Sequence, residues 1–488
     1  MSKLKIILLL ALLLSIRSAS AVEVTILYWG DRLARDIPNQ KSVRDTTHVG
    51  GAAQLAGFVD SYRTGNPDAF LFVAGGDLAG TVAAYKTDGV APAKVLGKIN
   101  PDAYAPGIVD FTYGTEKLKS ALKKGKINAI SGNVHIDETG PFLPAYDDIR
   151  TGNVVVAVTS LLPARLKEMV PRDGVKSVTV ADPVATARDF VKDRRDDSDL
   201  IVVLSQLGRE YDSLLALNVP DIDLIIEGHS RTPFEKTFKV GKTFIVCSGP
   251  KGLLLGKLRL EVATDSSSVT LIEHDHIAIE SGLIKPSIVV KRAVQELEDR
   301  FTRQRGDKVA TLLTNWNVEN DGPSNLPQWV ADMMQQSSGS VKLALVNNLD
   351  FEKGFPRGDL YENDLFQIMP FEVPLVAFQI KGYEIRRVVE KQARGELPFL
   401  TWSGVNVLIE NGKPSQILVR GEGPLQDESE YAGVTNGLLW DRFLKETSLV
   451  PDVRPIFIFP ILQYQLMLET AGKQKVISTP LDGRWTVR

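Results

Sequence analysis

The sequence has little cysteine and no excess of charge of one sign. Its 488 residues include a single cysteine, Cys247, so the chain cannot build an internal disulfide framework. The 57 Lys and Arg residues nearly balance the 60 Asp and Glu residues, which leaves a net charge of −3. Proteins that bind nucleic acids usually carry a clustered basic excess, which is missing here. We therefore expect no nucleic-acid polymer as a partner.

The apolar stretch near the N-terminus is too short to cross a bilayer. It runs from Ile6 to Ile16, whereas a membrane-spanning helix needs about 20 apolar residues. Lys3 and Lys5 precede it and Ala19-Ser20-Ala21 follows it, which is the pattern of a cleaved secretory signal. We predict that residues 1–21 are a signal peptide, that the protein is exported to a periplasmic or extracellular location, and that it has no membrane anchor.

The rest of the composition is that of an ordinary globular protein. Hydrophobic residues make up 43% of the chain, and it contains no internal repeat or low-complexity tract. This excludes a mainly disordered or collagen-like chain, and the length predicts two to three domains. Because Cys247 follows the apolar run Phe244-Ile245-Val246, we predict that it is a small core residue and not a nucleophile.

Short apolar strands alternate with helical stretches from Val22 to about Val262, which favours an α/β sheet with functional loops at the strand ends. The clearest predicted strands are Val24–Leu27, Phe70–Val73, Val154–Ala157, Leu200–Leu204 and Leu224–Ile226. The clearest predicted helices are Gly51–Tyr62, Thr115–Lys124 and Val184–Asp196. A charged amphipathic helix is predicted at Val290–Arg305, and a second region with its own apolar runs begins near Asn317.

Polar residues follow three of these strands. Asp31 comes after the first strand, Asp77 follows Ala74-Gly75-Gly76, and His229 lies in Glu227-Gly228-His229-Ser230. Asp and His side chains that converge from several strand ends can bind a divalent metal. The alternative is that each Asp caps a turn and that His229 only hydrogen-bonds a neighbouring loop.

Taken in order, these loops resemble those of the exported 5'-nucleotidases, which join a calcineurin-like metallophosphoesterase domain to a C-terminal nucleotide-binding domain. The matching segments are Tyr28–Leu33, Ala74–Thr81, Gly107–Gly114, Gly228–Arg231 and Phe399–Gly404. The resemblance implies a four-layer metallophosphoesterase-type α/β sandwich joined by a helix to a second α+β domain. It places the first domain at 22–287, the connecting helix and linker at 288–316 and the C-terminal domain at 317–488.

The departures from the family pattern affect the positions that bind metal and catalyse the reaction. The resemblance implies two metals bridged by Asp77, with Asp31 and His229 as surviving ligands, which together activate a water against phosphorus. The other ligand positions are replaced, and they correspond to Leu33, Ile108, Gln206 and Arg231. The catalytic His-Asp pair corresponds to Val109 and Thr112, which leaves no intact catalytic residue. Asp110 is a candidate substitute base, or else a surface or capping acid.

Arg231 suggests how the site persists without metal. Two converging carboxylates repel each other unless a cation compensates them. We hypothesise that the Arg231 guanidinium lies against Asp31 and Asp77 and replaces one metal; the alternative is that it points to solvent.

The positions of the family's nucleotide site in the second half are also partly substituted. Glu352 stands where the resemblance implies a phosphate-binding Arg, and a carboxylate there would repel phosphate. Phe399 matches one of two aromatics that hold the base, so it is the predicted substrate-binding residue. Trp402 and Trp440 offer further aromatic faces, although core packing is the simpler interpretation.

Three functional hypotheses follow. The first is a non-catalytic homologue of these phosphoester hydrolases, a pseudoenzyme that acts as a binding or interaction module. The second is a weak single-metal phosphoesterase in which Asp31, Asp77, Gln206 and His229 hold Mn, Zn or Mg. The third is a solute-binding protein that takes a nucleotide or another small molecule into the cleft between its halves.

Overall fold

The computed structural model describes residues 21–40, 47–137, 139–170, 172–230, 233–263, 268–303, 305–339, 341–369, 373–440 and 454–488. Residues 1–20 of the predicted signal peptide and Arg231 lie outside these ranges. Among the described residues, no helix is both long and apolar enough to cross a bilayer.

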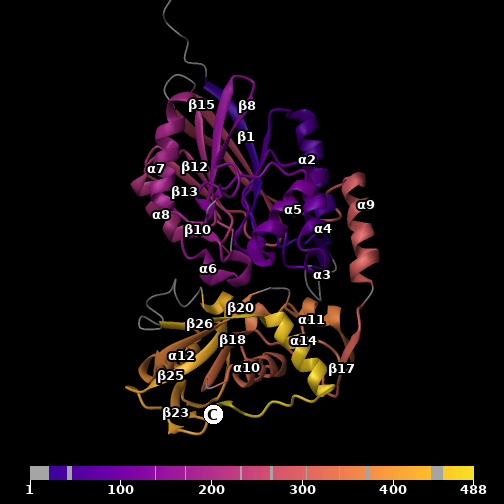
Figure 1. Cartoon of the computed structure of the whole chain (residues 1–488), viewed down its shortest axis with the longest axis vertical. Coiled ribbons are helices and arrows are strands. Elements are labelled where there is room, and N and C mark those ends of the chain that lie inside the picture. Colours follow the sequence, from indigo (N-terminus) through magenta and orange to yellow (C-terminus); the bar gives the residue numbers. More distant parts are fainter. Residues whose placement is uncertain are drawn as a thin grey trace, which may run out of the picture.

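Two β-sheets face each other in the first half of the chain (Figure 1). The first sheet has the strand order β16 (Ser268–Ala278), β15 (Leu254–Ala263), β1 (Ala21–Trp29), β4 (Phe70–Val73) and β5 (Ala103–Tyr104). The second has the order β13 (Phe238–Val240), β14 (Thr243–Val246), β12 (Leu224–Glu227), β11 (Leu200–Ser205), β9 (Val154–Leu161) and β8 (Tyr146–Thr151). The five predicted strands are thus confirmed as parts of β1, β4, β9, β11 and β12.

Residue alternation along each strand produces four layers. In β1, Ile26 and Tyr28 face the core between the sheets, whereas Leu27 and Trp29 face the helices outside. The outer layer on the first sheet consists of α2 (Ala52–Gly65), α4 (Val90–Ile99), α5 (Thr115–Gly125) and α9 (Ile288–Leu297). The outer layer on the second sheet consists of α7 (Pro183–Arg194) and α8 (Arg209–Asn218). The predicted four-layer α/β sandwich is confirmed, and Cys247 is buried in the core as predicted.

Strand β16 anchors the strand that leads into the polar loops. The Tyr28 ring lies over Gly256, where a Cβ would come within 2.0 Å of it. The Tyr28 hydroxyl and the Thr237 hydroxyl bond the two ring nitrogens of His274, at 2.7 and 2.8 Å. Burial, together with a smaller effect of the neighbouring His276, lowers the pKa of His274 to about 4 against the opposing effect of Asp275.

This histidine predicts a dependence of stability on pH. Because the folded-state pKa lies below the value of about 6.5 in an unfolded chain, stability is full above pH 6.5 and falls as the pH drops toward 4. We expect the melting temperature to fall between pH 7 and 5, and to fall less in a His274→Gln variant. His48→Gln, at an exposed histidine, is the matched control. Equal pH dependence of His274→Gln and wild type would contradict the assignment.

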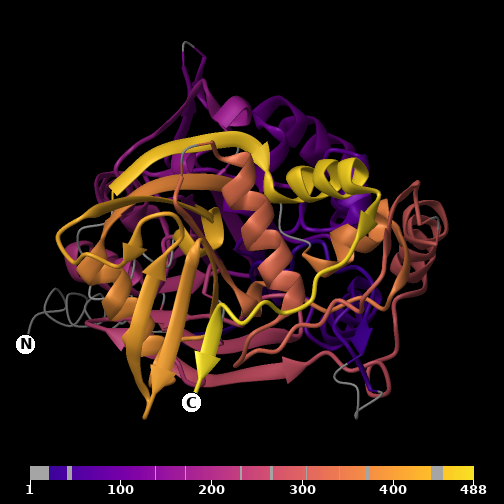
Figure 2. The ribbon, with the colours of Figure 1, turned by 90° about the horizontal axis from the view of Figure 1, so that it is seen from below.

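Three sheets lie in the described part of the second half. The central one has the order β21 (Leu400–Ser403), β18 (Leu343–Asn347), β25 (Glu430–Asn436), β20 (Pro374–Lys381) and β26 (Arg454–Leu462). A smaller sheet consists of β19 (Gly358–Tyr361), β17 (Lys308–Leu312) and β27 (Val476–Ile477). The last consists of β24 (Gly423–Pro424), β23 (Lys413–Val419), β22 (Val405–Glu410) and β28 (Trp485–Val487), and Figure 2 shows β28 beside β22 at the C-terminus. The main helices are α10 (Asn325–Ser337), α11 (Glu362–Ile368), α12 (Gly382–Ala393) and α14 (Gln463–Gln474).

A short helix of the first half packs into the core of the second. Val82, on α3 (Val82–Lys86), belongs to the apolar cluster of α10, α11 and α14. The Tyr85 ring contacts Phe366 and Tyr464, with centroids 6.0 and 5.4 Å apart. Lys86 pairs with Glu362 at 2.5 Å. The junction between the halves is therefore an apolar contact closed by an ion pair.

Candidate functional site

The loops that follow β1, β4 and β12 meet tightly at one edge of the sandwich. The amides of Asp31 and Leu33 donate to the carbonyls of Gly75 and Gly76, at 2.7 and 2.6 Å. Glycine is required at these contacts: a Cβ on Gly76, where φ is +73°, would lie 2.0 Å from Asp31 Oδ1. A Cβ on Gly228 would lie 1.9 Å from the carbonyl oxygen of Ala74. The predicted convergence of the loops is present, and no open space separates their backbones.

A buried guanidinium occupies the centre of this edge. Arg32 has an exposed fraction of 0%, and its stem packs against Gly252. Its Nε donates to Asp77 Oδ2 at 3.2 Å, and its Nη1 donates to Asp36 Oδ1 at 2.6 Å. Asp77 also accepts from the Arg32 amide at 3.2 Å and from Trp29 Nε1 at 3.0 Å. Both carboxylate oxygens of Asp77 are therefore engaged by Arg32 and Trp29.

The electrostatics of this cluster favour a charged Arg32. Burial by itself lowers the pKa of Arg32, but the carboxylates of Asp77 and Asp36 outweigh burial and raise it. Burial raises the pKa of both Asp77 and Asp36. The Arg32 guanidinium lowers both pKa values, but the effect of burial remains the larger. The fixed cation thus supplies the positive charge that two buried carboxylates need.

Asp31, Gln206 and His229 meet beside this cluster. Gln206 Nε2 donates to Asp31 Oδ1 at 3.1 Å and to the carbonyl of Ala74 at 2.6 Å, while its Oε1 accepts from the Ile108 amide at 3.3 Å. Because both neighbours at the Nε2 end are acceptors, the amide has its NH2 group toward Asp31. His229 Nδ1 lies 3.7 Å from Asp31 Oδ2. Gln206 thereby connects three loops through hydrogen bonds.

The donor set does not fit a two-metal centre. The oxygens of Asp77 face a guanidinium and an indole N–H, and Gln206 presents an NH2 group where a ligand needs a lone pair. Within the described ranges, no three His, Cys, Asp or Glu side chains come together in a way that could hold a metal ion. The positions of Leu33 and Ile108 are filled by buried apolar side chains.

Asp110 is buried and ties two loops together. Its exposed fraction is 1%, so the surface interpretation is wrong, and its bond to the Gly107 amide confirms a capping role. Its Oδ2 also accepts from the Gly76 amide and the Tyr104 hydroxyl, and its Oδ1 accepts from the Leu78 amide. Burial raises its pKa to about 7, against the opposing effect of these hydrogen bonds. A pKa near 7 suits a general base, but the enclosed and fully engaged carboxylate favours a structural role.

The two positions that the resemblance assigns to a catalytic pair carry no acid or base. Val109 and Thr112 lie in one 3-10 helix, Ile108–Tyr113. The Thr112 hydroxyl donates to the Val109 carbonyl at 2.6 Å, which occupies it within its own turn.

Glu352 joins the two halves. It pairs with Lys251 at 2.6 Å and with Arg35 at 3.2 Å, and both cations belong to the first half. The Glu352 carboxylate thus faces two cations of the first half.

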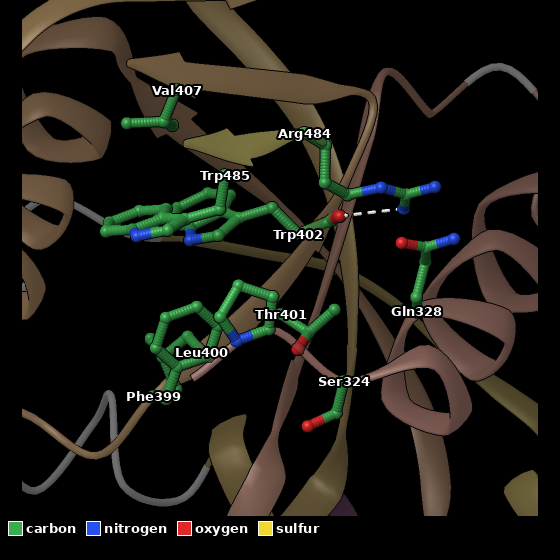
Figure 3. Close-up of a pocket in the computed structure, with 10 residues that line it drawn as sticks. Ser324, Gln328, Phe399, Leu400, Thr401, Trp402, Val407, Arg484 and Trp485 are labelled. Carbon is green, nitrogen blue, oxygen red and sulfur yellow. Dashed lines mark hydrogen bonds between the residues drawn. The ribbon is translucent and has the colours of Figure 1, made fainter. Parts of the chain in front are cut away.

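Phe399 lies in a cavity too small for a nucleobase. The cavity measures about 20 Å³, which is room for roughly one water molecule. Figure 3 shows the Phe399 ring beside the indoles of Trp402 and Trp485, and its centroid lies 5.4 Å from that of Trp485 in an edge-on contact. Arg484 donates to the Trp402 carbonyl at 2.9 Å. Trp402 and Trp440 are buried, which confirms the core interpretation for both.

Sequence reasoning missed Arg32. It occupies the variable position between two expected ligand positions, and its signal was Asp36 four residues later, the spacing of an ion pair on one helical turn. The hypothesis for Arg231 concerns a residue outside the described ranges, so it stays a prediction.

Comparisons with known proteins agree on one family. A family model described as 5'-nucleotidase, C-terminal domain, matches residues 308–443. The human 5'-nucleotidase is 24% identical over 83% of this chain and 78% of that protein. The endonuclease YhcR of Bacillus subtilis is 22% identical over 61% of this chain, which spans only 26% of that protein. The crystal structure of a 5'-nucleotidase precursor from Thermus thermophilus is 21% identical, with a TM-score of 0.69 over 96% of this chain and 99% of that one.

Proposed function

Because this chain belongs to the 5'-nucleotidase family, whose reaction is the hydrolysis of nucleotide phosphoesters, we propose that it is an exported member that no longer performs this reaction. In this proposal the chain is a pseudoenzyme that keeps the family scaffold as a binding module for a small molecule. The proposed location is periplasmic or extracellular, as the signal pattern of residues 1–21 predicts.

One observation carries the proposal. The Arg32 guanidinium, buried against Asp77 and Asp36 at 3.2 and 2.6 Å, takes the charge-compensating role that the family gives to a metal. Gln206 supports it, because its hydrogen bonds to Asp31, Ala74 and Ile108 connect loops that metal coordination would otherwise hold. Val109 and Thr112 offer nothing to stabilise the charge of a transition state.

A phosphatase assay tests this proposal. Purified protein is incubated with AMP, p-nitrophenyl phosphate and bis(p-nitrophenyl) phosphate, each with Mn²⁺, Zn²⁺ or Mg²⁺, and a working 5'-nucleotidase is the positive control. We expect product release at the rate of the protein-free blank. Release that requires metal, scales with protein concentration and disappears in His229→Ala would overturn the proposal.

That result would favour the single-metal alternative. Its motivation is that His229 Nδ1 lies 3.7 Å from Asp31 Oδ2, so that two potential metal ligands come together. Such a site would be weak, since the Gln206 NH2 group faces Asp31 and Asp77 is bound to Arg32.

A further inference from the structure

Two neighbouring helices of the first half carry five exposed lysines. Lys94 and Lys98 lie on α4, Lys123 and Lys124 lie in the last turn of α5, and Lys126 caps the C-terminus of α5. We call these five residues the lysine surface. The whole chain has a net charge of −3, so this surface is a local excess of positive charge.

The backbones of α4 and α5 touch at the lysine surface (Figure 1). A Cβ on Gly97 would lie 1.8 Å from the carbonyl oxygen of Gly125, and a Cβ on Gly125 would lie 2.5 Å from the carbonyl oxygen of Ala93. Four of the five lysines directly precede or follow one of these three residues in the sequence. Because no side chain separates the helices at this contact, the fold gathers the charges of both helices in one place.

No acid among the described residues pairs with the lysine surface. The one lysine of the two helices with an ion-pair partner there is Lys117, which lies at the other end of α5 and is 2.8 Å from Asp88. The single acid of α5, Glu116, lies in its first turn. The C-terminal ends of the two helices attract cations, but each carries only about half of a negative elementary charge. Lys94 and Lys98 repel each other, because they are four residues apart on one helix.

The residue types of the two helices distinguish between classes of partner. Neither helix contains an arginine or an aromatic residue, whereas phosphate groups and bases are recognised individually by bidentate arginines and stacked rings. No large apolar side chain is exposed on these two fully described helices, and stable protein–protein interfaces are built around such anchors. A lysine is a hydrated point charge on a flexible stem, which suits a diffuse negative surface. The anionic surface of a bilayer attracts clustered lysines in this way.

We propose that the lysine surface holds the protein on a bilayer of anionic phospholipids by electrostatic attraction, without insertion into the apolar interior. Each lysine near such a bilayer strengthens attachment about fivefold. The α4 helix ends at Ile99, just before β5 begins, whereas the loop that contains Asp110 leaves the opposite end of β5. The lysine surface is therefore directed away from the polar loops, and attachment leaves those loops uncovered. The proposal goes beyond the proposed function and does not depend on the absence of hydrolysis.

Co-sedimentation with vesicles tests the proposal. The mature protein, from which the predicted signal peptide has been removed, is mixed with vesicles of phosphatidylglycerol and phosphatidylcholine in equal parts, or of phosphatidylcholine alone. We expect binding to the anionic vesicles, no binding to the neutral ones, and release in about 1 M NaCl, where the Debye length is about 3 Å. Absence of binding to the anionic vesicles, or equal binding to the neutral ones, would overturn the proposal. Tighter binding of a DNA duplex at the same phosphate concentration would also overturn it, because the partner would then be a nucleic acid.

Two double variants of equal net charge locate the contact. Lys98→Gln with Lys124→Gln removes one charge from each helix and should weaken binding to the anionic vesicles about tenfold or more. Lys236→Gln with Lys413→Gln removes two exposed lysines outside the lysine surface and should bind like wild type. Because all four side chains are exposed, both double variants should keep the melting temperature of the wild type. Equal affinities of the two double variants would contradict the assignment, since binding would then follow net charge alone.

Discussion

Replacement of Arg32 by methionine is expected to destabilise the first half of the protein by about 3–5 kcal/mol, because it leaves two buried carboxylates without a cation. The side chain is fully buried, and its two ion pairs, with Asp77 and Asp36, are buried as well. Urea unfolding followed by circular dichroism measures the change. Stabilisation of the loops by a bound metal would instead make the guanidinium dispensable.

A control variant and a rescue variant separate the contribution of the Arg32 charge to stability from that of its packing. Arg386→Met removes a surface arginine paired with Asp427 and should cost less than about 1 kcal/mol. Adding Asp36→Asn and Asp77→Asn to Arg32→Met removes the uncompensated charges and should restore part of the stability. An Arg32→Met variant as stable as wild type would refute the role that we give this residue.

Replacement of Asp110 by alanine is expected to cost about 3 kcal/mol or more. The carboxylate accepts from the amides of Gly76, Leu78 and Gly107, and each orphaned buried donor costs about 1–3 kcal/mol. The loops after β4 and β5 would lose the hydrogen bonds by which Asp110 connects them, and only those of Gln206 would remain of the two side-chain links described above. The measurement is again the urea midpoint.

The control for Asp110 is an exposed acid on α2, Asp60, which no ion pair holds among the described residues. Asp60→Ala should change stability by no more than about 0.5 kcal/mol. A catalytic base behaves differently, since its removal abolishes turnover and leaves stability intact. That pattern in Asp110→Ala would show that the residue serves catalysis and not structure.

The strands of the first half followed from local sequence patterns, whereas its four-layer arrangement was implied by the resemblance to the 5'-nucleotidases. Buried strands such as Leu200–Ser205 are continuous apolar runs, and each ends where a polar residue begins a loop. The same patterns predicted that the loops of Asp31, Asp77 and His229 would converge at the carboxyl ends of the strands, and the backbones of these loops do meet.

The chemistry of that edge depends on contacts that no local pattern records. Arg32 reads as a variable loop residue, and only the fold brings Asp77, 45 positions later, to its Nε. Asp110 likewise reads as a surface acid until the loops of Gly76 and Leu78 enclose it. Phe399 lies where the resemblance places a base-binding aromatic residue. Its ring is instead in contact with Trp485, which is 86 positions later in the sequence.

These contacts support the proposal that groups of the chain itself take the place of a dissociable ion. A metal cross-links loops and balances carboxylates only while it is bound. Here Arg32 balances Asp77 and Asp36, and Gln206 and Asp110 connect the loops.

Metal content per chain tests this account most directly. The protein is expressed with Mn²⁺ and Zn²⁺ supplied, desalted gently and weighed by native mass spectrometry, and its urea midpoint is measured with and without EDTA. The account predicts the mass of the bare chain and the same midpoint in both buffers. Two metal ions per chain, together with a midpoint that falls in EDTA, would contradict it.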